Sequence, residues 1–130
     1  MIRKNIITSL IAAMGLFANC TAQEAVKTLQ PKEFITAAKA DSTAVILDVR
    51  RPDEFKEAHL DGAANLDWLN QASFRQGMAT LDKSRTFYIY CRSGRRSNAA
   101  AMKMQAEGFK VVDMKGGILR WQELGMPVVK

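Results

Sequence analysis

Apolar residues follow two alternating patterns from about residue 25 to the end of the chain. Continuous apolar runs with β-branched or aromatic residues are typical of strands that are covered on both faces. Such runs are TAVILDVR at 43–50, TFYIY at 86–90 and FKVVDM at 109–114. Shorter extended segments are predicted just before Pro31 and at Ala63 to Leu66.

Helical spacing of apolar residues predicts helices between these segments. The first begins at Pro31, which suits a first helical position, and carries Phe34, Ala37 and Ala38 on its apolar face. Strands that alternate with helices imply right-handed crossovers and a parallel sheet, which places the domain in the α/β class. The other helical segments are a turn in PDEFKEAHL, a helix in DWLNQASFRQGMATLDKS through Leu69, Phe74 and Met78, SNAAAMKMQAEG closed by Gly108, and ILRWQELG closed by Gly125.

The first 22 residues differ from the rest and predict a signal peptide. Arg3 and Lys4 form a positive start, Ile6 to Ala18 is an apolar run of thirteen residues, and small residues follow up to Ala22. A bilayer-spanning helix needs about 20 residues, so a permanent membrane anchor is disfavoured. The protein is therefore expected to be exported, with one domain at residues 25–130.

Two cleavage sites are open at the end of this signal. GLFANC is similar to a bacterial lipoprotein signal, in which Cys20 becomes the lipidated first residue, although Phe17 and Asn19 depart from the usual pattern. Cleavage after Ala22 is the alternative. The first cut leaves a protein that is lipid-anchored to a bacterial membrane, and the second leaves a periplasmic one.

Composition and charge narrow the classes of function. With 130 residues, 48% of them hydrophobic and 25% charged, the chain fits one compact soluble domain. Removal of Arg3 and Lys4 lowers the formal charge from +6 to about +4, and so small a surplus argues against a nucleic-acid-binding face. His59 is the only histidine, so a His/Cys metal cluster is not expected. No cofactor is expected either.

Either cleavage leaves Cys91 as the only cysteine of the predicted folded domain, so no disulfide forms within that domain. It lies between a strand and a helix, where open α/β folds place their ligand sites. Unpaired N–H groups and the dipole at a helix N-terminus stabilise a thiolate or a bound anion. Ser93 and Gly94 are small enough for the chain to curl around an anion, and Ser97 can donate a hydroxyl or cap the helix. Local positive charge comes from Arg92, Arg95 and Arg96.

The segment CRSGRRS resembles the active-site loop of rhodanese-type sulfurtransferases. Cysteine-dependent phosphatases have a similar loop but place an arginine six positions after the cysteine, where this chain has Ser97. LDVRRPDEFKEAHLDGAANL is similar to the first rhodanese signature, with Ala58 in place of a common glycine, and KGGILRWQELGMPV is similar to the closing one. The three segments occur in the order of the family, and the resemblance spans about residues 25–130.

The resemblance implies a doubly wound α/β domain, in which helices flank a central parallel sheet, and a ping-pong sulfur transfer. The Cys91 thiolate would attack the outer sulfur of an anionic donor such as thiosulfate, release sulfite, and pass its persulfide sulfur to cyanide or a thiol. The backbone N–H groups of residues 92–97 would cradle the persulfide. Arg92 and Arg95, with Arg96 third, would attract the donor. Supporting hydrogen bonds are expected from Asp48 and Arg50, and structural roles from His59, Phe109 and Trp121.

Other functions stay open at this point. The same loop would suit a thiol redox sensor, whose mark would be a sulfenic acid on Cys91, or a persulfide-binding module. A phosphatase or an arsenate reductase is disfavoured by the serine at position 97. The expected partners are a small anionic sulfur donor and a thiol or cyanide acceptor, with no nucleic acid. Membrane contact is expected only through the signal peptide or a lipid anchor, and the domain is expected to be a monomer.

Overall fold

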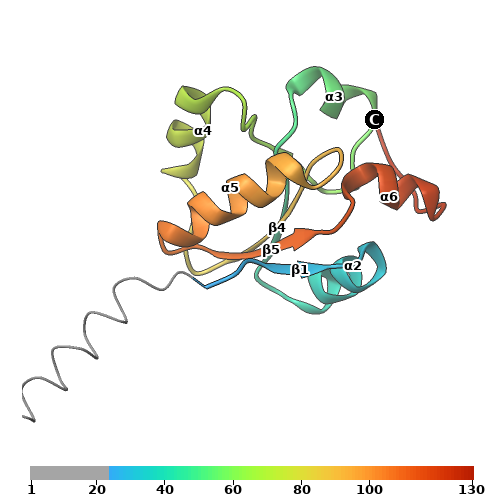
Figure 1. Ribbon diagram of the computed structural model, residues 1–130, viewed down its shortest axis with the longest axis horizontal. Coiled ribbons are helices and arrows are strands. Elements are labelled where there is room, and N and C mark those ends of the chain that lie inside the picture. Colours follow the sequence, from blue (N-terminus) through green and yellow to red (C-terminus); the bar gives the residue numbers. More distant parts are fainter. Residues whose placement is uncertain (1–23) are drawn as a thin grey trace, which may run out of the picture.

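The computed structural model describes residues 24–130, and the predicted signal peptide with Cys20 lies outside the described residues. The centre of the domain is a five-stranded sheet with the spatial order β1–β5–β4–β2–β3, in which every pairing is parallel (Figure 1). The predicted α/β fold with a central parallel sheet is confirmed. The strands are β1 (Lys27–Leu29), β2 (Ala44–Asp48), β3 (Ala64–Asn65), β4 (Thr86–Tyr90) and β5 (Lys110–Met114).

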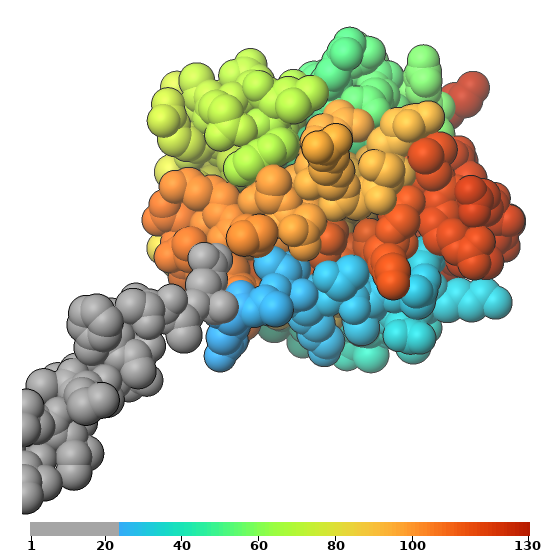
Figure 2. Space-filling view, in the orientation of Figure 1, coloured from blue at the N-terminus to red at the C-terminus, as the bar shows by residue number. Residues whose placement is uncertain are grey.

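Helices cover both faces of this sheet. The helices are α2 (Pro31–Ala40), α3 (Pro52–Glu57), α4 (Gln71–Met78), α5 (Arg95–Ala106) and α6 (Gly117–Glu123). Helices α2 and α6 pack on one face, α4 and α5 pack on the other, and α3 follows the carboxyl end of β2 (Figure 1). In the space-filling view, α5 in orange lies between α4 in green and β1 in blue (Figure 2). None of the helices within residues 24–130 is long and apolar enough to cross a membrane.

The side chains of β4 divide between two cores because successive residues of a strand point to opposite faces. Phe87, Ile89 and the following Cys91 lie in the core beneath α4 and α5. Tyr88 and Tyr90 lie in the core beneath α2 and α6. The thiol of Cys91 therefore lies on the same side of the sheet as α5.

Two boundaries differ from the sequence prediction. Helix α5 begins at Arg95, two residues before the predicted start at Ser97, because Gly94 adopts a positive φ of 104° and forms the N-cap. This places two of the three arginines in the first helical turn. Leu69 was predicted on the apolar face of α4, but its side chain is 59% exposed. The helix begins later, at Gln71, because the Asn70 side chain accepts a hydrogen bond from the Ser73 N–H and caps it.

Candidate active site

The Cys91 thiol lies at the carboxyl end of β4 and at the start of α5. The residue is only 1% exposed, and its Sγ accepts a hydrogen bond from the Gly94 N–H at 3.1 Å. The twelve-residue helix α5 follows Gly94 directly, and the first N–H groups of this helix have no carbonyl partner within it. A negative charge on Sγ is therefore stabilised by a backbone donor and by the positive end of the helix dipole.

The active-site loop, residues 91–97, is held from behind by the start of α6. The Ile118 N–H donates to the Cys91 carbonyl at 2.9 Å, and the Leu119 N–H donates to the Arg92 carbonyl at 3.1 Å. Gly117 makes this approach possible, because a Cβ there would collide with the Arg92 carbonyl and lie 2.6 Å from the Cys91 oxygen. Gly117 also has a positive φ of 63°, which a larger residue adopts at a cost. This glycine entered the sequence prediction only within the segment KGGILRWQELGMPV, and its packing role was not predicted.

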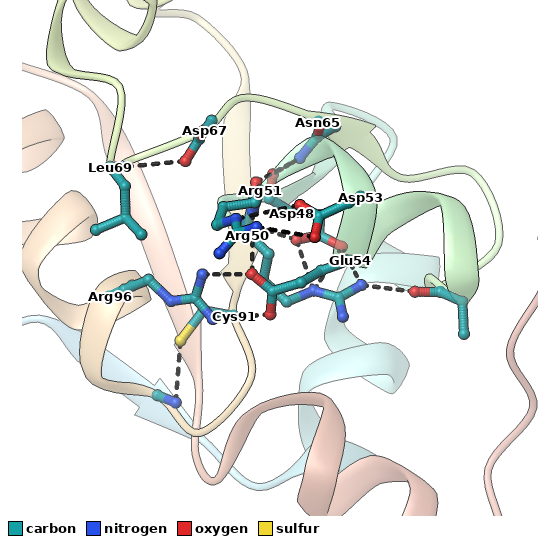
Figure 3. A network of polar contacts seen from close by, with 12 residues as sticks. Asp48, Arg50, Arg51, Asp53, Glu54, Asn65, Asp67, Leu69, Cys91 and Arg96 are labelled. Carbon is teal, nitrogen blue, oxygen red and sulfur yellow. Dashed lines mark hydrogen bonds and ion pairs between the residues drawn. The ribbon is translucent and has the colours of Figure 1, made fainter.

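The three arginines of the loop have different surroundings. Arg96 forms a two-armed ion pair with Glu54 of α3, at 2.7 and 3.0 Å, beside Cys91 (Figure 3). The hydrogen bonds from Arg96 lower the pKa of Glu54 below its ordinary value, and Glu54 in turn raises the pKa of Arg96. Arg92 and Arg95 are exposed and form no ion pair with any of residues 24–130. Arg96 is thus fixed in place, whereas the other two can turn towards an arriving anion.

Glu54 was not singled out from the sequence, and its ion pair gives a testable prediction. Glu54→Gln should lower the free energy of unfolding at pH 7 by about 1 kcal/mol, because both partners are largely buried. Since the folded-state pKa of Glu54 lies below 4.5, the stabilisation is complete above about pH 4.5 and is lost as the pH falls further. Urea unfolding of both proteins at pH 7 and pH 3.5 measures the difference.

Asp53→Asn is the matched control for this measurement. Asp53 pairs with Arg51 at 3.0 Å, but both side chains are more than half exposed, so its removal should change the stability by less than about 0.5 kcal/mol. Equal effects of the two variants at pH 7, or a Glu54 effect that is undiminished at pH 3.5, would contradict the role assigned to the partly buried pair of Glu54 and Arg96.

Asp48 and Arg50 form a buried ion pair at the end of β2. The Arg50 Nη2 lies 2.7 Å from the Asp48 carboxylate and also donates to the Ala58 carbonyl at 2.6 Å. Within residues 24–130, no hydrogen bond joins either side chain to residues 92–97, so the expected direct support of the loop is not seen. The pair instead fixes the two ends of α3, which carries Glu54 to Arg96 (Figure 3).

The other residues given structural roles lie away from the thiol. His59 stacks on Phe55 with ring centroids 3.7 Å apart, and its Nδ1 lies 2.7 Å from the Phe55 carbonyl. Trp121 belongs to the core beneath α2 and α6, and its indole N–H donates to the Pro127 carbonyl at 2.9 Å. Phe109 is buried in the core beneath α5. No group of three or more His, Cys, Asp or Glu side chains among residues 24–130 is placed to hold a metal ion.

Two cavities bear on where a substrate could lie. The larger, of about 570 Å³, lies on the α2 and α6 side and is lined by no residue of the active-site loop. The smaller, of about 240 Å³, lies between α3 and α6 and is lined by Arg92 together with Glu54, Glu57 and Leu119. Of these two cavities, only the smaller is lined by a residue of the active-site loop, so it is the one that bears on substrate binding near that loop.

Residues 30–124 match the family model described as Rhodanese-like domain. The chain belongs to the rhodanese-like domain family. A protein of Allochromatium vinosum named Sulfurtransferase is 33% identical over 99 residues, which cover 75% of this chain and 90% of that relative. YqhL of Bacillus subtilis, named as an uncharacterized protein, is 34% identical over 76% of this chain and 75% of its own length.

Solved structures of rhodanese-like proteins share the fold. A rhodanese-related protein from Thermoplasma volcanium superimposes with a TM-score of 0.70 at 27% identity, over 79% of this chain and 97% of that one. The family is one of sulfur-transfer proteins, and the suspected resemblance to rhodanese-type sulfurtransferases is confirmed. In this rhodanese-like domain, the loop that carries Cys91 is the candidate site for sulfur transfer.

Proposed function

We propose that this protein is an exported single-domain sulfurtransferase that carries sulfane sulfur as a persulfide on Cys91. The observation that carries the proposal is the buried Sγ of Cys91, which accepts the Gly94 N–H at 3.1 Å at the N-terminus of α5. Membership of the rhodanese-like family supports the same chemistry. The composition of residues 1–22 supports export.

The first half-reaction transfers sulfur to the protein. The Cys91 thiolate attacks the outer sulfur of a donor such as thiosulfate, a new S–S bond forms, and the bond between the two donor sulfurs breaks. Sulfite leaves with the electron pair of the broken bond, and the persulfide anion keeps the negative charge. The backbone donor at Gly94 and the helix dipole stabilise that charge where it develops.

The second half-reaction returns the thiolate. A nucleophile, either cyanide or a cellular thiolate, attacks the outer sulfur of the persulfide, and the Cys91 thiolate leaves. Cyanide carries the sulfur away as thiocyanate, whereas a thiol acceptor becomes a persulfide itself. No net oxidation takes place, so the cycle needs no cofactor.

The exposed Arg92 is expected to draw in the anionic donor. Arg92→Ala should raise the KM for thiosulfate about three- to tenfold at low salt with little change in kcat, and the difference should shrink at 0.5 M salt because exposed charges are screened. Initial rates of thiocyanate formation measure both constants. Arg75→Ala removes another exposed arginine, on α4, and should leave both constants unchanged. A fall in kcat with unchanged KM would contradict the steering role.

Intact mass spectrometry of the mature protein tests the proposed function. Incubation with thiosulfate should add the mass of one sulfur atom, and subsequent cyanide should remove it as thiocyanate. The starting mass also identifies the N-terminal residue, which distinguishes lipidation at Cys20 from cleavage after Ala22 and tests export. If folded protein gains no sulfur, the proposed transfer is wrong. Peroxide-dependent formation of a sulfenic acid on Cys91 would then favour the redox-sensor alternative.

A further inference from the structure

Asp113 is a buried acidic residue that has no part in the proposed mechanism. It lies in β5, paired with Ile89 of β4 on one side and Thr28 of β1 on the other. The residue is 2% exposed, and its Oδ1 is buried without a hydrogen-bond partner among residues 24–130. A carboxyl group is rarely buried in this way, because an unpaired charge loses its hydration.

Asp113 lies next to the active-site loop and on the same side of the sheet as the thiol. Ile89 and Cys91 lie on that side of the sheet. Asp113 pairs with Ile89, so it lies on the strand next to β4, level with the residue two positions before Cys91. Strand spacing and rise place the Cα atoms of Asp113 and Cys91 about 8 Å apart. The side chains of Ser97 and Asn98, in the first two turns of α5, are close enough to affect the ionisation of Asp113. Asp113 therefore lies beneath the helix start that stabilises the Cys91 sulfur.

No salt bridge of the described residues neutralises Asp113. Burial raises the pKa of Asp113 to about 6, and the nearby groups of Ser97, Asn98 and Met114 offset only part of that rise. The carboxyl is then neutral at acidic pH and charged at neutral pH. The titratable and charged groups on the elements around it are Cys91, Tyr88 and Tyr90 of β4 and its end, Arg95, Arg96 and Lys103 of α5, Lys27 of β1, and Lys110 and Lys115 of β5 and its end.

We propose that Asp113 is a positioning residue whose charge sets the reactivity of Cys91 through the N-terminus of α5. An ionised Asp113 opposes the positive field of the helix start and so disfavours the thiolate and any anion in the loop. A protonated Asp113 leaves that field intact. At a separation of about 8 Å and an effective dielectric constant of about 20, the negative charge of an ionised Asp113 lowers the thiolate population of Cys91 about ten- to thirtyfold. The consequence for sulfur transfer rests on the proposed function, whereas the effect on thiol reactivity does not.

The rate of Cys91 alkylation by iodoacetamide, followed from pH 4 to pH 9, tests the proposal without any sulfur donor. In Asp113→Asn, the pH of half-maximal rate should lie about one pH unit lower than in the wild type. The variant profile should follow a single ionisation, whereas the wild-type profile should deviate from one because two groups titrate together. Asp61→Asn, which removes an exposed carboxylate, should reproduce the wild-type profile. Superimposable profiles of wild type and Asp113→Asn would overturn the proposal.

A second measurement covers the case in which Asp113→Asn does not fold. The carboxyl carbon of Asp113, followed by NMR in the wild-type protein, should titrate near pH 6. It should show a second inflection where the thiol ionises, and alkylation of Cys91 should abolish that inflection. A single step that alkylation leaves unchanged would overturn the proposal. Persulfide formation with thiosulfate is measured separately, so failure of sulfur transfer is not confused with failure of the coupling.

Discussion

Replacement of Cys91 by serine is expected to abolish sulfur transfer while the domain stays folded. The hydroxyl has nearly the size of the thiol and can still accept the Gly94 N–H, but it does not attack a sulfane sulfur at neutral pH. The rate of thiocyanate formation should fall at least about 1000-fold, and the mass gain with thiosulfate should vanish. Because the residue is buried, the more polar hydroxyl should lower the free energy of unfolding, by about 1 kcal/mol.

A second thiol in the same loop provides the control for this variant. Ser93→Cys in the Cys91→Ser background restores one thiol to the loop, but at an exposed position outside the contact with the Gly94 N–H. It should not restore turnover, because the reaction needs a thiolate at that backbone donor and not merely in the loop. Turnover in the double variant, or a mass gain in Cys91→Ser itself, would show that the geometry at Cys91 does not carry the transfer.

Local signals in the sequence were enough to predict the sheet and the position of the thiol. The run TFYIY is apolar throughout because β4 is covered on both faces, and a polar loop that follows such a strand must lie at the edge of the sheet. Reliance on local signals also explains why the start of α5 was predicted two residues too late. The arginines suggested a loop, whereas the positive φ of Gly94 lets the helix begin directly after it.

Contacts between distant segments were not predictable in this way. Glu54 and Arg96 are 42 residues apart in the sequence and meet only because α3 and α5 begin side by side at the carboxyl edge of the sheet. Asp113 did leave a local signal, since an acidic residue interrupts the otherwise apolar run VVDM. That signal shows a buried carboxyl but not its neighbour, because the pairing of β5 with β4 depends on the tertiary fold.

Gly117→Ala should damage both the loop and the stability of the domain. The added methyl group would collide with the Arg92 carbonyl and lie 2.6 Å from the Cys91 carbonyl, and both are backbone atoms that cannot move aside alone. Displacement of that peptide moves Cys91 relative to the Gly94 N–H. A shift of about 1 Å is enough to lower the sulfur-transfer rate about 100-fold. Overpacking together with the positive φ should lower the free energy of unfolding by about 3 kcal/mol.

Gly62→Ala separates the collision from the backbone strain. Gly62 also has a positive φ, 79°, but a Cβ there meets no atom within 4 Å. This variant should lose about 1 kcal/mol from strain alone and keep its sulfur-transfer rate within about twofold. Chemical unfolding and thiocyanate formation, measured on both variants, then isolate the contact between α6 and the loop. If both variants lose the same stability and keep the same rate, the close approach of Gly117 does not hold the loop, and the support must come from the two N–H donors that follow it.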